Sequence, residues 1–66
     1  MTGKISRILA DKNFGFITGE DGNDYFFHKS SLVNENSFNQ GLIGKSVEFE
    51  DGQSTKGLRA ESVFVE

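Results

Sequence analysis

The sequence predicts an all-β fold in which five short strands close into a small barrel. The chain has 66 residues, which is enough for a single domain over residues 1–66. Eight glycines, seven phenylalanines and no proline indicate many turns between β-forming aromatic segments. No segment has a sustained apolar period of 3.6 residues, which argues against a helical domain. Closure of the sheet removes exposed strand edges in a chain too short for two packed sheets.

The expected strands alternate with polar or glycine-rich turns. A turn at 10–13 and the strong turn signal GEDGND at 19–24 separate the first three strands. Residues 29–44 are polar and interrupted, so we expect a long loop with one helical turn near residues 30–33. Residues 52–57 are expected to form the last loop. The strands themselves are expected at residues 3–9, 14–18, 25–28, 45–51 and 58–66, with Val47 and Phe49 sharing one face of the fourth.

Several classes of protein are disfavoured by composition. The chain has no cysteine, so it can form neither disulfides nor thiolate metal sites. No apolar run approaches the roughly 20 residues that span a bilayer. The first twelve residues lack the apolar core of a secretory signal. We therefore expect a soluble cytoplasmic protein with no metal, cofactor or membrane partner.

The charge balance is less informative. Seven basic and ten acidic side chains give a net charge of −3. This value alone does not favour nucleic-acid binding, but the local placement of cations decides binding more than net charge does.

Alternation along the second and third strands indicates which side chains fill the barrel. Ile17 is the natural core residue of the second strand, and Gly15 beside it leaves space in a tight barrel. In the third strand Tyr25 and Phe27 are expected inside, because the face with the lone histidine is the better outer face. The hairpin then presents one outer aromatic patch, made of Phe14, Phe16, Phe26 and His28.

An aromatic patch that faces water requires an explanation. Flat rings with cations nearby suit stacking on the bases of single-stranded nucleic acid. The cations expected near the patch are Arg7, Lys12 and Lys29, with Lys56 and Arg59 as neighbours from the last loop. In the alternative, the phenylalanines pack under the 29–44 loop as a second small core, since phenylalanine is usually buried, and the histidine is structural.

These residues resemble the bacterial cold-shock proteins, the free-standing form of the cold-shock domain. The first nucleic-acid-binding motif of that family reads roughly K-G-F-G-F-I, and residues 12–17 read K-N-F-G-F-I. The second motif reads roughly V-F-V-H-F, and residues 25–29 read Y-F-F-H-K. The opening Gly3, the length and the ending at residues 56–63 also match, so the resemblance covers the whole chain.

The resemblance implies a five-stranded antiparallel closed barrel of the oligonucleotide-binding type. It implies binding of single-stranded RNA and DNA with low sequence specificity, often with a preference for pyrimidines. It also implies an RNA chaperone or a regulator of transcription or translation in a stress response. We expect a monomer in which Phe14, Phe16, Phe26 and His28 face the nucleic acid.

The first strand departs from the family pattern. Where the family has lysine, tryptophan, phenylalanine and asparagine, this chain has Ser6, Arg7, Ile8 and Leu9. Lys29 replaces an aromatic residue, and Leu58 replaces the usual proline. A guanidinium can both stack on a base and pair with phosphate, so our hypothesis is that Arg7 takes over from the tryptophan. Lys29 then exchanges stacking for phosphate attraction. The alternative for Arg7 is a solvated cation without a role.

The same strand carries a geometric expectation. If Ile5 points inward, strict alternation would bury Arg7, so we expect a bulge or strong curvature between them. Among the remaining candidates, Lys12 is expected to meet phosphate, with Lys56 and Arg59 as weaker candidates. Phe38 either adds a ring to the edge of the patch or pins the long loop to the barrel.

Two other functions compete with nucleic-acid binding. The altered first strand favours a protein-interaction domain that kept the barrel and lost the ligand, whereas the intact hairpin opposes it. An enzyme would require a poised acid, base, nucleophile or metal. With one histidine, no cysteine and no metal-ligand spacing, the sequence predicts no catalytic residue.

Overall fold

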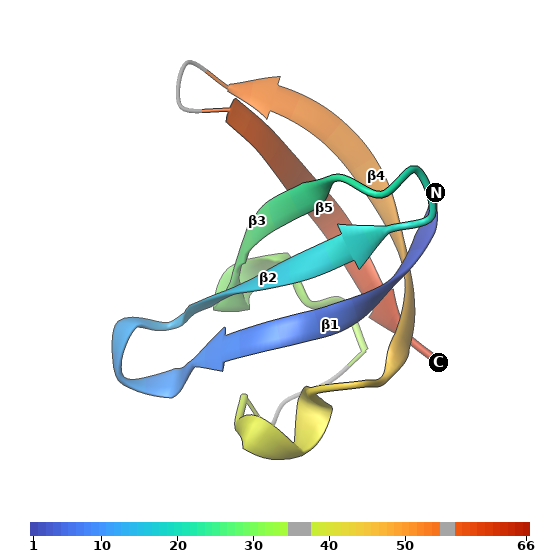
Figure 1. Cartoon of the computed structure of the whole chain (residues 1–66). Helices are drawn as coiled ribbons and strands as arrows, with labels where there is room; N and C mark the ends of the chain where they lie inside the picture. The colour runs from blue at the N-terminus through green and yellow to red at the C-terminus, as the bar shows by residue number, and fades with distance from the viewer. Residues whose placement is uncertain (35–37, 55–56) are drawn as a thin grey trace.

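The computed structural model describes residues 1–34, 38–54 and 57–66 of the chain. Within these residues five strands form a closed barrel in the order β1-β2-β3-β5-β4 (Figure 1). The predicted fold class is confirmed. The strands are β1 (Thr2–Leu9), β2 (Phe14–Gly19), β3 (Asp24–His28), β4 (Ser46–Ser54) and β5 (Gly57–Val65).

One of the five strand contacts differs from the expected antiparallel arrangement. The pairs β1–β2, β2–β3, β1–β4 and β4–β5 are antiparallel. The β3–β5 pair is parallel and places Phe26 opposite Arg59. The reason is geometric: strand direction alternates at each antiparallel contact, and a ring with an odd number of strands cannot alternate throughout. The contact that closes this barrel is therefore parallel.

Short 3₁₀ helices connect the strands. They are η1 (Ala10–Lys12), η2 (Lys29–Ser31) and η3 (Gln40–Leu42). The helical turn expected near residues 30–33 is thus present one residue earlier, while η3 was not predicted. The buried Leu42 and a hydrogen bond of 2.7 Å from Gln40 Nε2 to the Ile8 carbonyl attach η3 to β1. In the described part of the chain, no helix has the length and apolar character needed to cross a membrane.

The segment after η2 continues the barrel wall beside β5. Leu32 forms a parallel bridge with Val63, and the Val33 amide donates to the Val63 carbonyl at 2.9 Å. The Asn34 side chain then pairs with the backbone of Val65, accepting from its amide at 2.8 Å and donating to its carbonyl at 2.7 Å. These bonds satisfy backbone groups of Val63 and Val65 in β5.

The expected loop over residues 52–57 is too long. β4 continues through Ser54 and β5 begins at Gly57, with Gly52 opposite Arg59 and Ser54 opposite Gly57. The glycine and polar residues of this segment indicate a turn locally, but pairing across the hairpin satisfies their backbone groups as strand.

The barrel interior is filled by aliphatic and aromatic side chains from every strand. The residues expected inside from alternation, Ile17, Tyr25 and Phe27, are all buried, as are Val47 and Phe49. Among the residues that the structure describes, the buried apolar side chains are Ile5, Ile8, Ile17, Tyr25, Phe27, Leu42, Val47, Phe49, Ala60, Val63 and Val65. Because these residues take the inner faces of β2 and β3, the alternating residues of the hairpin lie on the outer face.

Candidate nucleic-acid interface

Three phenylalanine rings form a cluster on the outer face of the β2–β3 hairpin, and we call it the phenylalanine triad. Phe14 and Phe16 come from β2, and Phe26 comes from β3. The ring centroids of Phe14 and Phe26 lie 5.2 Å apart, and those of Phe16 lie 6.0 Å from each of the other two. These distances and the near-perpendicular planes of Phe16 are typical of edge-to-face packing. The triad is thus a preformed, half-buried aromatic surface.

The triad is not part of the barrel core. The partly buried apolar side chains packed against the core are Leu32, Phe38 and Leu58. The triad rings instead contact one another on the opposite side of the wall. Within the described residues, the structure favours an outer aromatic patch over a second small core under the 29–44 loop.

His28 lies at the end of β3, opposite Phe14 in the register of the hairpin. Its Nδ1 accepts a hydrogen bond of 3.1 Å from the backbone amide of Ser30 and lies 3.0 Å from the Ser30 hydroxyl. A backbone amide only donates, so Nδ1 is the acceptor in this contact, and Nε2 is the ring nitrogen that can donate. His28 therefore has an N–H donor that these contacts do not use, next to the triad.

A bulge in β1 positions Arg7. The register between β1 and β2 shifts between Ile5 and Arg7, while Ile5 and Ile8 are both buried. The expected bulge is confirmed, and its effect is to keep Arg7 exposed instead of buried. The Cα partner of Arg7 is Phe16, so the guanidinium side chain begins beside the triad.

Arg7 belongs to a row that crosses four strands. Arg7 pairs with Phe16, Phe16 with Phe26, and Phe26 with Arg59. The four side chains share the outer face, so two phenylalanines lie between two arginines. We call this set the Arg–Phe–Phe–Arg row. Neighbouring strands lie about 4.8 Å apart, so the row extends over roughly 14 Å of surface.

Two lysines lie at the end of the hairpin that carries Phe14 and His28. Lys12 ends η1 just before β2, Lys29 begins η2 just after β3, and both are exposed. The Lys29 amide donates to the Asn13 carbonyl at 2.8 Å, which holds the two segments together. Lys56, the remaining cation of the predicted site, lies outside the described residues.

Phe38 occupies a different position from the triad. Its ring lies 6.0 Å from that of the buried Phe27, in an edge-to-face arrangement, and it packs against the core. This contact favours the interpretation that Phe38 pins the long loop to the barrel.

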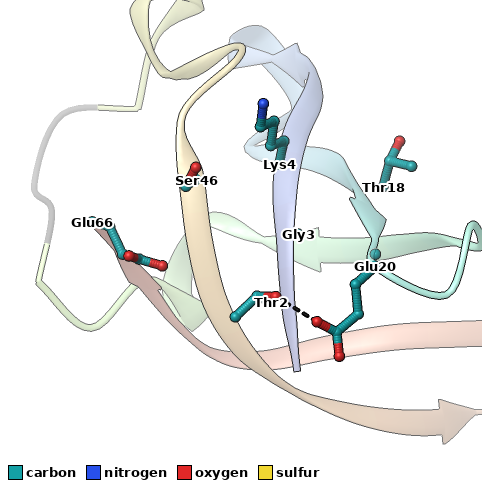
Figure 2. Close-up of a pocket in the computed structure, with 8 residues that line it drawn as sticks. Thr2, Gly3, Lys4, Thr18, Glu20, Ser46 and Glu66 are labelled. Atoms are coloured by element: carbon teal, nitrogen blue, oxygen red, sulfur yellow. Dashed lines mark hydrogen bonds between the residues drawn. The ribbon is translucent and has the colours of Figure 1, made fainter.

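A pocket of about 530 Å³ lies beside this interface, on the outer face of β1, β2 and β4 (Figure 2). It includes none of the predicted site residues, and no pattern in the sequence indicated it. Its side chains are mixed in charge: Lys4 lies with Glu20 and Glu66, and the Thr2 hydroxyl donates to the Glu20 carboxylate at 2.6 Å. Two carboxylates against one cation make this pocket a poor site for phosphate.

Comparison with known proteins agrees with this geometry. The model of the 'Cold-shock' DNA-binding domain family matches residues 1–65. The chain belongs to the cold-shock domain family. The family-level function is nucleic-acid binding.

Relatives in several bacteria cover nearly the whole chain. Cold shock protein 1 of Lactiplantibacillus plantarum is 41% identical over 61 residues, which are 92% of this chain and 91% of that protein. Cold shock-like protein CspLB of Listeria monocytogenes is 40% identical over 62 residues, covering 94% and 92%. Cold shock-like protein CspE of Bacillus anthracis is 36% identical over 63 residues, covering 96% and 92%.

The structure of this cold-shock domain also shows that Arg59 lies closer to the triad than the sequence indicates. Arg59 was a weak candidate because nothing local connects it with the hairpin. The parallel β3–β5 contact, between residues far apart in sequence, places it opposite Phe26. The row is thus a consequence of barrel closure.

Proposed function

We propose that this protein binds single-stranded RNA and DNA with low sequence specificity, as a monomer, and acts as an RNA chaperone or a regulator of transcription or translation. The observation that carries this proposal is the phenylalanine triad, held on the outer wall between exposed cations. Every base has a flat face, so stacking on these rings tolerates many sequences and contributes about 1–3 kcal/mol per base. We expect this protein to prefer pyrimidines, which are the smaller bases.

The cations supply the second part of the proposed affinity. Arg7, Lys12, Lys29 and Arg59 are exposed around the triad. Each phosphate that they neutralise releases counterions, which makes binding weaker as salt increases. Lys29 and Arg7 stand where the family has rings, so this chain relies more on charge and less on stacking than its family pattern.

The direct test is a titration of a fluorescein-labelled oligothymidine, followed by anisotropy, at low and at high salt. The chain has no tryptophan, so quenching of intrinsic tryptophan fluorescence cannot report binding. The proposal predicts saturable binding at low salt that weakens as salt increases. Oligoadenosine serves as the comparison for base preference. Absence of binding at low salt would instead favour the alternative, a protein-interaction domain that kept only the barrel.

Chaperone action is tested separately with an RNA hairpin that carries a fluorophore and a quencher. A protein that holds single strands should open the hairpin at concentrations that saturate it. Binding without opening would restrict the function to regulation by occupancy.

We propose that Arg7, at the position where the family has a stacking tryptophan, makes two kinds of contact: it stacks on a base and it pairs with a phosphate. Arg7→Ala should weaken oligothymidine binding and reduce the slope of log K against log[salt] by about 0.7, the value for one phosphate contact on a single strand. Arg7→Lys should keep the slope and lose the stacking part. If Arg7→Ala changes neither affinity nor slope, Arg7 is a solvated cation without a role.

A further inference from the structure

Arg59 lies at the β5 end of the Arg–Phe–Phe–Arg row. Its Cα partner across the parallel contact is Phe26. Its neighbour Ala60 is fully buried, so Arg59 itself points to the outer face. The Arg59 side chain therefore begins beside the ring of Phe26, on the face where the proposed strand would lie.

Arg59 already has an anionic partner. Its Nε lies 3.7 Å from Oε1 of Glu61, and the two side chains are 44% and 58% exposed. Within β4–β5 the Cα partner of Glu61 is Glu50, and like charges directly opposite each other repel. Arg59 is thus the cation that offsets the repulsion at Glu61. Exposed pairs of this kind are held weakly and are easily exchanged.

We infer that Arg59 binds a phosphate of the bound strand beside the base on Phe26, and that Glu61 competes with this phosphate for the guanidinium. The inference rests on the proposed single-strand binding. A carboxylate and a phosphate both present anionic oxygen acceptors to a guanidinium, so each weakens the attraction of Arg59 for the other. Glu61 therefore lowers the affinity of the row for the bound strand.

The first part of the test compares two substitutions that change charge equally. Glu61→Gln removes the competitor, and it should tighten oligothymidine binding by about two- to fivefold, the range expected from releasing an exposed pair. Glu48→Gln is the matched control, because Glu48 is exposed on the neighbouring strand and pairs with Phe64 instead of a cation. Its effect should be smaller, since it changes only the net charge.

The second part asks whether Glu61 acts through Arg59. Arg59→Gln should weaken binding and reduce the salt slope by about 0.7. In the Arg59→Gln background, Glu61→Gln should tighten oligothymidine binding by no more than the Glu48→Gln control does. Lys4→Gln controls for loss of a cation, because Lys4 lies in the pocket with two carboxylates.

The outcomes separate the inference from the function on which it rests. If the unmodified protein binds and Glu61→Gln equals Glu48→Gln, or if its gain persists without Arg59, the inference is wrong and the proposed function stands. An unchanged salt slope in Arg59→Gln also overturns the phosphate contact. If the unmodified protein does not bind at low salt, both proposals fail.

Discussion

Gly15 is a buried residue of β2, opposite Ile8 of β1 and between the triad residues Phe14 and Phe16 in sequence. A Cβ atom on this residue would lie 2.5 Å from the Arg7 carbonyl oxygen and 3.0 Å from the Phe27 ring. The first distance is to backbone, which cannot move aside as a flexible side chain can. Gly15 is therefore required by packing, and it allows the bulged segment of β1 to lie against β2.

Gly15→Ala should lower the free energy of unfolding by about 1–3 kcal/mol, the cost of overpacking a well-filled interior. Gly52→Ala is the matched control, because its Cβ would meet nothing nearer than 3.8 Å. Urea unfolding followed by circular dichroism measures both. Equal stability of the two variants would contradict this account of the β1–β2 contact.

Asp21 and Tyr25 form a polar contact at the other end of the hairpin. The Tyr25 hydroxyl donates to the Asp21 carboxylate at 2.6 Å, and the Asn23 amide donates to it at 3.1 Å. The hydrogen bond from Tyr25, followed by that from Asn23, lowers the pKa of Asp21 below its ordinary 3.8. The same bond to Asp21 raises the pKa of Tyr25 above 10.0.

These pKa shifts predict how stability varies with pH. A carboxyl whose folded pKa lies below 3.8 stabilises the fold above that pH and loses the contribution as pH falls through the folded value. A phenol whose folded pKa lies above 10.0 contributes below that pH and loses it as pH increases through the folded value. Both contributions are therefore complete at neutral pH.

Tyr25→Phe removes the donor and keeps a ring against Phe49, whose centroid lies 5.0 Å from that of Tyr25. The variant should be less stable than the unmodified protein at neutral pH, and the difference should shrink as pH falls below 3.8. Denaturant unfolding across the acid range measures this difference. A difference in stability that stays constant with pH would show that the hydrogen bond from Tyr25 does not lower the pKa of Asp21.

Two bulges adapt the strands to the barrel at the scale of the elements. In β1 the bulge lets Ile5 and Ile8 both point inward, although their spacing is odd. In β5 the register shifts opposite Glu48 and Glu50, and Ala60 and Val63 both point inward. A bulge reverses the alternation of faces, so a strand can fill the core on both sides of it.

The β5 bulge places Ser62 in the left-handed region, with φ of 51°. A branched residue is strained there, so Ser62→Val should cost about 1–2 kcal/mol of unfolding free energy. Ser62→Gly is the control, because glycine adopts this conformation freely and should keep stability close to that of the unmodified protein. Thermal unfolding of both variants checks the bulge. Tolerance of valine would argue that residue 62 is extended.

Short-range patterns in the sequence were sufficient to predict part of the barrel core and one of the two bulges. Alternation identified Ile17, Tyr25 and Phe27 as core, and the problem of burying Arg7 predicted the β1 bulge. The β5 bulge was not predictable, because Val63 and Val65 already fit plain alternation. The position of Arg59 was not predictable either, since it depends on which strand closes the barrel beside β3.

At the scale of the whole molecule, cations and carboxylates are both exposed near the triad. The cations Arg7, Lys12, Lys29 and Arg59 lie around it, but the Glu61 carboxylate is 3.7 Å from the Arg59 Nε, and β4 and the C-terminus carry the further exposed carboxylates Glu48, Glu50, Asp51 and Glu66. With a net charge of −3, the long-range field does not attract a polyanion. Binding must therefore depend on short-range stacking and on the few cations at the row.

The most direct test of the central claim compares phenylalanines on two faces of the barrel. Phe16→Ala and Phe26→Ala should each weaken oligothymidine binding by about five- to 150-fold, corresponding to about 1–3 kcal/mol per stacked base. Phe64→Ala is the control, because Phe64 is 46% exposed on β5, opposite Glu48, and outside the triad. It should bind as the unmodified protein does. Unchanged affinity in both triad variants, or a loss in Phe64→Ala equal to theirs, would contradict the account.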